Sequence, residues 1–513
     1  MPSRRGWVGS RKAVQAVALI AFLGLFLLLR RDGLPGDLAN LPMRFDPLLM
    51  LAGTLAARTL MVGSALALAT VLLTLLFGRA WCGWLCPLGT VLDLVPVKSR
   101  SGRRPVVPEG MRRVKYVLLL VILFAAVLGN QTLLFFDPLA ILYRTLTAAV
   151  WPALDQIATA LETLLAQIPG SDGPISSLDT VIRPLVLPAE PVSYQDTLSI
   201  AAFFVALVAL NALAPRFWCR YLCPLGGFLG LISRVAIFRR SVATSCSSCG
   251  LCAEDCPTGT IDAARNYASD PAECTVCMGC LVSCPLGAVK FKPSLSQAEG
   301  RPYDPSRRQF LLALGGAAAG IALCGSDMLA KRESPFLLRP PGSRESNPDA
   351  VALTSCTRCG ECVRVCPTGA IQPAALQLGL EGLGTPLLVP RLGYCDYSCN
   401  ACGQVCPTEA IPLLSLEDKQ QQVIGKAYID QNRCLAWSDH LPCIVCQEMC
   451  PLPEKAIQLE EQDVWRPDGA TAKLQLPHVL RDLCIGCGLC EYRCPVSGDA
   501  AIRVYVPPLA VPF

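Results

Sequence analysis

Six runs of four cysteines, each ending in Cys-Pro, constrain this chain more than any other feature. Four runs share the spacing C-x2-C-x2-C-x3-C-P, and they are Cys246, Cys249, Cys252, Cys256; Cys274, Cys277, Cys280, Cys284; Cys356, Cys359, Cys362, Cys366; and Cys484, Cys487, Cys490, Cys494. Two runs open with a longer gap, and they are Cys395, Cys399, Cys402, Cys406 and Cys434, Cys443, Cys446, Cys450. A disulfide framework demands no such fixed period, whereas this pattern is the ligand set of [4Fe–4S] clusters. The runs therefore predict six such clusters.

The fourth cysteine of a run ordinarily ligates the cluster of a neighbouring run. For the first two runs we therefore predict one cluster on Cys246, Cys249, Cys252 and Cys284, and another on Cys274, Cys277, Cys280 and Cys256. In the later four runs, adjacent pairing and nested pairing (first with last, second with third) both fit the spacing. The sequence leaves these two arrangements open.

The N-terminal half contains an internal repeat. RAWCGWLCPLG at 79–89 returns as RFWCRYLCPLG at 216–226, and FDPL at 45–48 returns at 136–139. Mean hydropathy is +0.43 and only 17% of residues are charged. Apolar segments near 13–29, 59–77, 114–135 and 196–214 approach the roughly 20 residues that cross a bilayer. We therefore expect residues 1–240 to form an α-helical membrane domain of four spans, arranged as two pseudo-symmetric pairs.

Basic residues predict the orientation of this domain. They cluster before the first apolar segment and after the second and fourth, whereas 137–195 contains only Arg144 and Arg183. Positive charge favours the cytoplasmic side, so we expect loops 30–58 and 137–195 to lie outside. The stretch LDQIATALETLLAQI within the outer segment fits an amphipathic helix on the membrane surface or an ordinary connecting helix.

The repeated cysteines of the two CxxxCP motifs are Cys82, Cys86, Cys219 and Cys223. Within each pair the spacing is i, i+4, so on a helix both thiols share one face. Three interpretations stay open: two redox-active dithiols, one four-thiolate metal or cluster site shared across the axis, or small buried hydrophobes.

Asp46 and Asp137 occupy the same position in the two FDPL segments. Carboxylates at this depth are candidates to accept protons from a quinol. Asp-Pro is also the pattern of a helix start, with Asp at the N-cap and Pro as the first helical residue. Both roles are compatible with one residue.

Residues 306–325, SRRQFLLALGGAAAGIALCG, place Arg307-Arg308 before a mild apolar run. This pattern predicts a twin-arginine export signal, although an ordinary buried helix also fits. A signal or anchor segment at 301–335 would separate a cytoplasmic two-cluster domain at 241–300 from an extracytoplasmic four-cluster domain at 336–513. The sequence leaves cleavage open, and Cys324 is expected to be a packing residue.

Histidine is nearly absent. Residues 1–439 contain none, so a bis-histidine haem b is not expected in the membrane part. His440 and His478 are expected to be surface or hydrogen-bonded residues rather than ligands. The net charge of +5 is spread through loops, so no nucleic-acid partner is indicated.

Residues 1–300, with the two W-C-x-x-L-C-P-L-G stretches and two cluster motifs, resemble the NapH/MauN-type membrane ferredoxins. Residues 306–513, with S-R-R-x-F-L and four motifs, resemble NapG, the exported four-cluster partner. The resemblance implies a multidomain protein with α+β ferredoxin domains in the bacterial inner membrane, active in anaerobic respiration. It further implies oxidation of quinol from the membrane quinone pool and electron delivery to a periplasmic reductase or c-type cytochrome.

Fusion of the two proteins in one chain leaves the terminal acceptor open. Two other functions are considered. The membrane half also resembles proteins that reduce copper during oxidase assembly, although the four-cluster half has no place in that scheme. A non-catalytic electron-wire subunit of a larger respiratory complex is the other alternative.

Overall fold

The computed structural model describes residues 4–29, 38, 40–61, 63–95, 108–167, 187, 192–294, 311, 314–316, 318–320, 335–342, 354–465 and 471–507. Arg307, Arg308 and Cys324 lie outside these residues, so the export signal stays a prediction. The chain divides into two compact units. The helical unit comprises Met1–Leu28, Ala39–Thr145 and Leu198–Ser326, and the four-motif unit comprises Leu29–Leu38, Leu146–Thr197 and Asp327–Phe513.

This division differs from the predicted domains in two respects. The described part of 241–300 belongs to the same compact unit as the helices, and the predicted outer segment from Leu146 to Thr197 belongs with the later four motifs. Both differences in the domain boundaries result from contacts between residues distant in the chain. Local composition does not indicate these boundaries.

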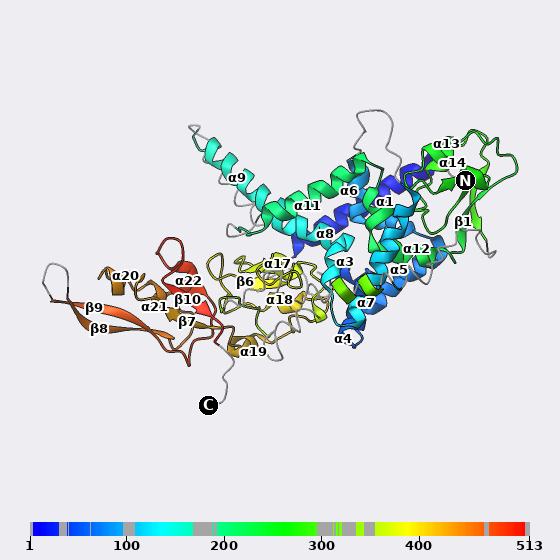
Figure 1. Cartoon of the computed structure of the whole chain (residues 1–513). Helices are drawn as coiled ribbons and strands as arrows, with labels where there is room; N and C mark the ends of the chain where they lie inside the picture. Colours follow the sequence, from blue (N-terminus) through cyan, green and yellow to red (C-terminus); the bar gives the residue numbers. More distant parts are fainter. Residues whose placement is uncertain are drawn as a thin grey trace. The chain divides into compact units, whose positions relative to one another are not determined.

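Helices dominate the helical unit (Figure 1). They are α1 Arg4–Leu28, α3 Leu41–Arg44, α4 Pro47–Ala57, α5 Ser64–Phe77, α6 Pro87–Leu94, α7 Val114–Val127, α8 Pro138–Thr145, α11 Thr197–Ala209 and α12 Pro224–Ser233. Among the described residues, only Gly6–Leu28 is long and apolar enough to cross a membrane, and a signal sequence would pass the same test.

The expectation of four spans is therefore not supported. The apolar segments near 59–77, 114–135 and 196–214 contain helices of only 14, 14 and 13 residues. At 1.5 Å per residue such helices measure about 21 Å, less than the roughly 30 Å hydrocarbon core. Helix-ending features explain the difference for α5, because Gly63 precedes it and Gly78 follows it with φ of 71°.

The sequence repeat is also a structural repeat. Asp46 caps α4 by accepting backbone N–H groups at 2.9 and 3.1 Å, and Asp137 caps α8 with the same two distances. Each CxxxCP motif forms a π-helical turn, Trp81–Leu85 or Trp218–Leu222. The last cysteine of each motif is extended, and its proline begins the next helix, α6 or α12.

The two-cluster part of the helical unit is built from short elements. They are β1 Phe238–Val242, α13 Leu251–Glu254, β2 Ile261–Asp262, β3 Ala268–Ser269, α14 Gly279–Ser283 and β4 Val289–Pro293. Strands β1 and β4 pair antiparallel from Phe238↔Pro293 to Val242↔Val289, and β2 pairs with β3. Both sheets are two-stranded, so packing around the cysteines must supply most of the order.

The four-motif unit combines helix α9, Trp151–Leu165, with short helices and hairpins. These later elements are α17 Glu361–Val365, β5 Ile371–Pro373, β6 Pro386–Leu388, α18 Ala401–Gln404, α19 Leu416–Gln421, β7 Lys426–Ile429, α20 Leu435–Ser438, α21 Val445–Glu448, β8 Ile457–Trp465, β9 Thr471–Val479, α22 Leu489–Arg493 and β10 Ile502–Tyr505. The β8–β9 hairpin extends away from the rest of this unit (Figure 1).

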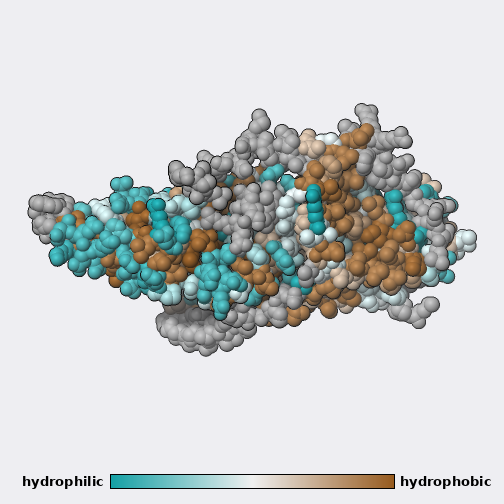
Figure 2. Space-filling model, turned by 90° about the horizontal axis from the view of Figure 1, so that it is seen from below, coloured by the Kyte–Doolittle hydropathy of each residue, from teal (hydrophilic) through white to brown (hydrophobic). Residues whose placement is uncertain are grey.

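The two units have different surfaces. In the face shown in Figure 2, hydrophobic residues cover much of the helical unit, and hydrophilic residues cover much of the four-motif unit. Exposed apolar side chains of the helical unit include Ile20, Leu68, Leu72 and Val205, each at least 58% exposed. Contiguous apolar surface of this kind marks contact with a membrane or a partner.

Candidate functional site

The cysteines of the first two runs form two groups of four thiols. Each such group of four is called a cage, and each run contributes cysteines to both cages. In cage 1 the Cys252 thiol interacts electrostatically with those of Cys246, Cys249 and Cys284, and these four residues line one pocket. In cage 2 the Cys274 thiol interacts with those of Cys277, Cys280 and Cys256. Each cage thus takes three cysteines from one run and the fourth from the other, as the sequence predicts.

The later runs follow the adjacent arrangement. In cage 3 the Cys362 thiol interacts with Cys359, Cys356 and Cys406, and in cage 4 the Cys402 thiol interacts with Cys395, Cys399 and Cys366. In cage 5 the Cys434 thiol interacts with Cys443 and Cys494, and Cys446 completes the pocket. In cage 6 the thiols of Cys487 and Cys490 interact with Cys484, and Cys487 interacts with Cys450.

Cages 4 and 6 are neighbours. The backbone N–H of Cys395 donates to the carbonyl of Cys487 at 2.8 Å, and the two thiols interact electrostatically. Cage 3 shares its run with cage 4, and cage 5 shares its run with cage 6, so the four cages form a series 3–4–6–5. Such a series is a path for single electrons.

The donor set fits iron–sulfur clusters. Backbone N–H groups reach the cysteine sulfurs, as from Ala427 to Cys484 at 3.3 Å and from Ile411 to Cys406 at 3.5 Å. Hydrogen bonds to the sulfurs tune the potential of such clusters. In the described part of the chain no group of His, Cys, Asp or Glu is tight enough for a single metal ion. A four-iron cube needs more widely spaced thiolates, one at each corner.

The CxxxCP cysteines lie at the meeting point of the two repeats. Arg216 of the second repeat donates to the carbonyl of Cys82 at 3.0 Å, and Arg79 of the first repeat approaches the carbonyl of Cys219 at 3.5 Å. Both arginines are 1% exposed. Each repeat therefore positions the cysteine turn of the other. Sequence reasoning missed this role, although Arg opens both copies of R-x-W-C.

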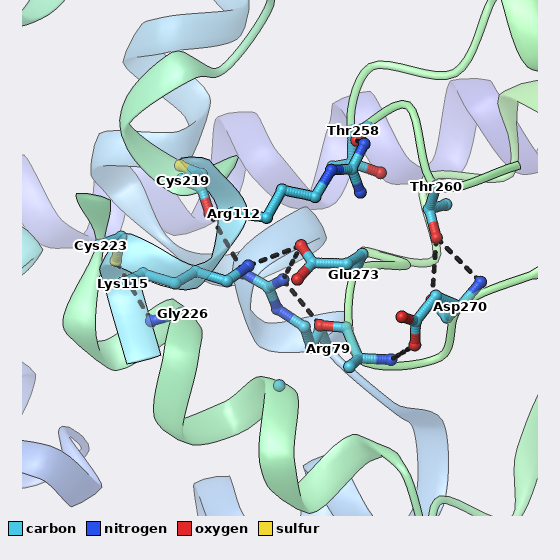
Figure 3. Close-up of polar contacts among 12 residues, drawn as sticks. Arg79, Arg112, Lys115, Cys219, Cys223, Gly226, Thr258, Thr260, Asp270 and Glu273 are labelled. Atoms are coloured by element: carbon cyan, nitrogen blue, oxygen red, sulfur yellow. Dashed lines mark hydrogen bonds and ion pairs between the residues drawn. The ribbon is translucent and has the colours of Figure 1, made fainter. Parts of the chain in front are cut away.

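Carboxylates balance these arginines. Arg216 forms two hydrogen bonds with Asp93, at 2.7 and 2.5 Å. Arg79 and Lys115 both contact Glu273, at 3.4 and 2.6 Å (Figure 3). Burial opposes ionisation of Asp93 and Glu273, yet the neighbouring cations outweigh it and lower the pKa of both carboxyl groups. Neither acid was singled out from the sequence.

Asp46 and Asp137 form a buried carboxyl pair. Both side chains are fully buried, and the two groups are close enough to hydrogen-bond with each other. One oxygen of each accepts the capping N–H groups, while the Oδ2 atoms have no N–H or O–H donor among the described residues. A proton shared between the Oδ2 atoms satisfies both. Burial raises the pKa of each carboxyl, and the neighbouring carboxyl raises that of Asp46 further.

The carboxyl pair lies nearer to the CxxxCP motifs than the predicted topology allows. The Phe45 ring lies 5.9 Å from that of Trp81, and the Phe136 ring lies 6.4 Å from that of Trp218. The sequence placed FDPL outside and CxxxCP inside, a span apart. The structure corrects this separation, because α4 folds back along α5 and returns the FDPL segment to the cysteine turn.

The two histidines lie near cage 5: His440 is in the loop between Cys434 and Cys443, and His478 follows Pro477, which lines the pocket of that cage. His478 contacts the Trp437 ring edge-on at 5.3 Å and approaches Glu460 at 3.5 Å. His440 adopts a positive φ of 51° in the loop that follows α20. The contacts of His478 agree with the predicted structural role, whereas Nδ1 of His440 is buried without a hydrogen-bond partner among the described residues.

Comparison with known proteins agrees with the cysteine pattern. Family models described as 4Fe-4S binding domains match residues 59–104 and 197–243, and a second such model matches 351–372 and 477–497. The first pair of matches covers the two CxxxCP repeats. No solved structure matches the chain.

Similar proteins carry ferredoxin-type names. The chain is 37% identical over 216 residues to the methylamine utilization ferredoxin-type protein MauM of Methylorubrum extorquens, covering 40% of this chain and 90% of MauM. It is 38% identical over 208 residues to the ferredoxin-type protein NapG of Escherichia coli, covering 39% and 84%. It is also 29% identical over 230 residues to the putative electron transport protein YccM of Escherichia coli, covering 44% and 53%. With four-cysteine cages in series and these relatives, the chain belongs to the MauM/NapG family of iron–sulfur ferredoxin-type electron-transfer proteins.

Proposed function

We propose that this protein is a membrane-associated quinol dehydrogenase that passes electrons through six [4Fe–4S] clusters to a periplasmic reductase or cytochrome. The observation that carries the proposal is the buried Asp46–Asp137 pair beside the cysteine turns of both repeats. Quinol oxidation releases two protons and two electrons. The pair, which already shares one proton, accepts one of the two protons, the other is released to water, and two clusters accept one electron each.

The environment of the pair supports proton exchange. Each carboxyl is held at a helix N-terminus by two backbone hydrogen bonds, so its position is fixed without using its second oxygen. Two carboxyl groups in contact cannot both ionise readily, so one proton is retained and its release is tuned by the other group. Acid–base groups of this kind contribute about 10²–10⁴-fold to a proton-transfer step.

We infer an extracytoplasmic position for the four-motif unit from the predicted twin-arginine signal at 306–325. Described residues of segment 146–197 contact α17 and β5 of the same unit. Arg364 stacks on Trp151 at 3.5 Å, and Gln372 donates to the carbonyl of Ser193 at 3.0 Å. Because 146–197 and the later four motifs belong to one compact unit, they are expected to lie on the same side of the membrane.

The test is reduction of the clusters by quinol. Purified, oxygen-protected protein is mixed with a reduced short-chain quinone, and the reduced-cluster EPR signal is followed in time. Asp46→Asn and Asp137→Asn keep the helix cap, because Asn also caps, but remove a proton acceptor. Glu162→Gln, on α9, is the control.

We expect wild type and the control to gain signal and the two Asn variants to be at least about 10²-fold slower. Clusters that dithionite reduces but quinol never does would reject quinol oxidation and leave the electron-wire function. Equal rates in all variants would reject the role of the carboxyl pair.

A further inference from the structure

The four CxxxCP cysteines lie together in the interior of the helical unit. Cys82, Cys86, Cys219 and Cys223 are 8%, 7%, 7% and 4% exposed, respectively. The Cys86 thiol interacts electrostatically with Cys82 of its own repeat and with Cys219 of the other. The Cys223 thiol interacts with Cys219, Cys82 and Cys86. Thiols therefore interact across the repeats as well as within them, which favours one group of four over two separate pairs.

Backbone N–H groups are directed at two of these sulfurs. The N–H of Gly226 donates to Cys223 Sγ at 3.2 Å (Figure 3), and the N–H of Gly89 donates to the Cys86 sulfur. Cys484 of cage 6 receives the same kind of bond. A Cβ at Gly226 would lie 2.7 Å from Arg79 Nη2, so a side chain at this position would displace the Arg79 guanidinium.

The surrounding charges call for a negative group. Arg79, Arg216 and Lys115 are at most 1% exposed, and the carboxylates that pair with them are those of Glu273 and Asp93. Three buried cations therefore share two anions, and uncompensated buried charge is costly. Neutral dithiols or disulfides would leave the imbalance, whereas four thiolates around an iron–sulfur core carry net negative charge.

The group of four adjoins cage 2. A Cβ at Gly83, between Cys82 and Cys86, would lie 2.0 Å from the carbonyl oxygen of Thr275, between Cys274 and Cys277. Trp84 Nε1 donates to the carbonyl of Val276 at 2.9 Å in the same loop. The Cys82 turn therefore lies directly against a loop that holds the second cage.

We propose that Cys82, Cys86, Cys219 and Cys223 together ligate one additional iron–sulfur cluster, shared between the two repeats and adjacent to cage 2. Each repeat contributes two thiolates, so neither repeat forms the site alone. Four cysteine thiolates suit both [2Fe–2S] and [4Fe–4S] clusters. The proposal does not require quinol to be the donor, so it stands or falls apart from the proposed function.

The experiment counts clusters directly. Anaerobic native mass spectrometry of the full-length protein gives the number of cluster masses per chain, and iron, sulfide and zinc are assayed on the same sample. Six four-iron clusters account for about 24 irons, so we expect wild type to carry about two or four more. The Cys82→Ser/Cys219→Ser double variant is expected to lose only these, and Cys324→Ser, outside every motif, to lose none.

A wild-type chain with six cluster masses and no more would overturn the proposal without reference to any variant. So would zinc in place of the additional iron, or a wild-type mass that shows two disulfides at these positions. Retention of all cluster masses in the double variant would place the additional iron elsewhere and equally reject the site.

Discussion

At the scale of single residues, the neighbours of a buried carboxyl group decide its role. Glu273 and Asp93 have structural roles, and Asp46 and Asp137 are the proposed acid–base pair. Glu273 and Asp93 are ionised because cations contact them, whereas Asp46 and Asp137 contact each other. The same residue type therefore has opposite pKa shifts in two places. Composition alone cannot distinguish these cases.

Glu273→Gln is expected to destabilise the helical unit. The substitution leaves Arg79 and Lys115 buried without a carboxylate, and breaking a buried pair in this way costs about 3–5 kcal/mol. The apparent melting temperature, followed by loss of cluster absorbance, should decrease. Asp262→Asn removes a partly exposed ion pair with Arg265 and is the control, with an expected change of about 0–1 kcal/mol. Equal effects of the two substitutions would contradict the buried network.

The carboxyl pair predicts a pH dependence. A carboxyl whose pKa is raised by folding contributes most below its unfolded pKa of about 3.9, and that contribution is lost as pH rises through the folded pKa. Wild-type melting temperature should therefore fall toward alkaline pH more steeply than that of Asp137→Asn, whose amide cannot ionise. Parallel slopes for the two proteins over about pH 5–9 would be inconsistent with a shared proton.

At the scale of elements, the two π-helical turns are the parts that connect the repeats to the cages. They end at an extended cysteine because the following proline disfavours helical backbone there. The close approach of the first turn to the Cys274–Cys277 loop depends on Gly83 having no side chain.

Gly83→Ala is expected to displace the first turn from that loop. A Cβ cannot be accommodated 2.0 Å from a backbone oxygen, so the loop that carries Cys274 and Cys277 must shift. We expect loss of the cage 2 cluster, about four irons per chain. Gly9→Ala, in α1 with open space around the position, should keep full iron content. Unchanged iron in Gly83→Ala would show that the turn and the loop do not touch.

At the scale of the whole molecule, electron flow depends on which cysteines share a cluster. Adjacent pairing makes the cages of the four-motif unit a single series, with cages 4 and 6 in the middle. Nested pairing would give a different order of cages in the series and different cages at its two ends.

Double substitutions distinguish the two arrangements. Cys450→Ser and Cys484→Ser remove ligands from the same cage, so combining them should cost about four irons, as either does alone. Cys450→Ser and Cys434→Ser affect different cages, so that combination should cost about eight. Iron assays on the two double variants and the three single variants provide the measurement. Nested pairing would place Cys450 in the cluster of the Cys395 run, so the Cys450/Cys484 double variant would then lose about eight irons.

The sequence alone determined the features that depend on local spacing. The cysteine runs predict cluster ligands because three corners of a cluster need cysteines a few residues apart. The Asp-Pro pairs predict helix caps because one side chain satisfies the N–H groups two and three positions later. The internal repeat predicts a structural repeat because similar sequences adopt similar local backbone conformations.

Tertiary structure decided everything that joins distant residues. The pairing of the later runs, the contact of Asp46 with Asp137 and the exchange of Arg79 and Arg216 between repeats all depend on packing. Apolar composition likewise did not fix helix length, because glycines and turns end the helices before they reach a full span. Local spacing sets which atoms can bind a cluster, but only the folded chain brings the two halves of a shared site together.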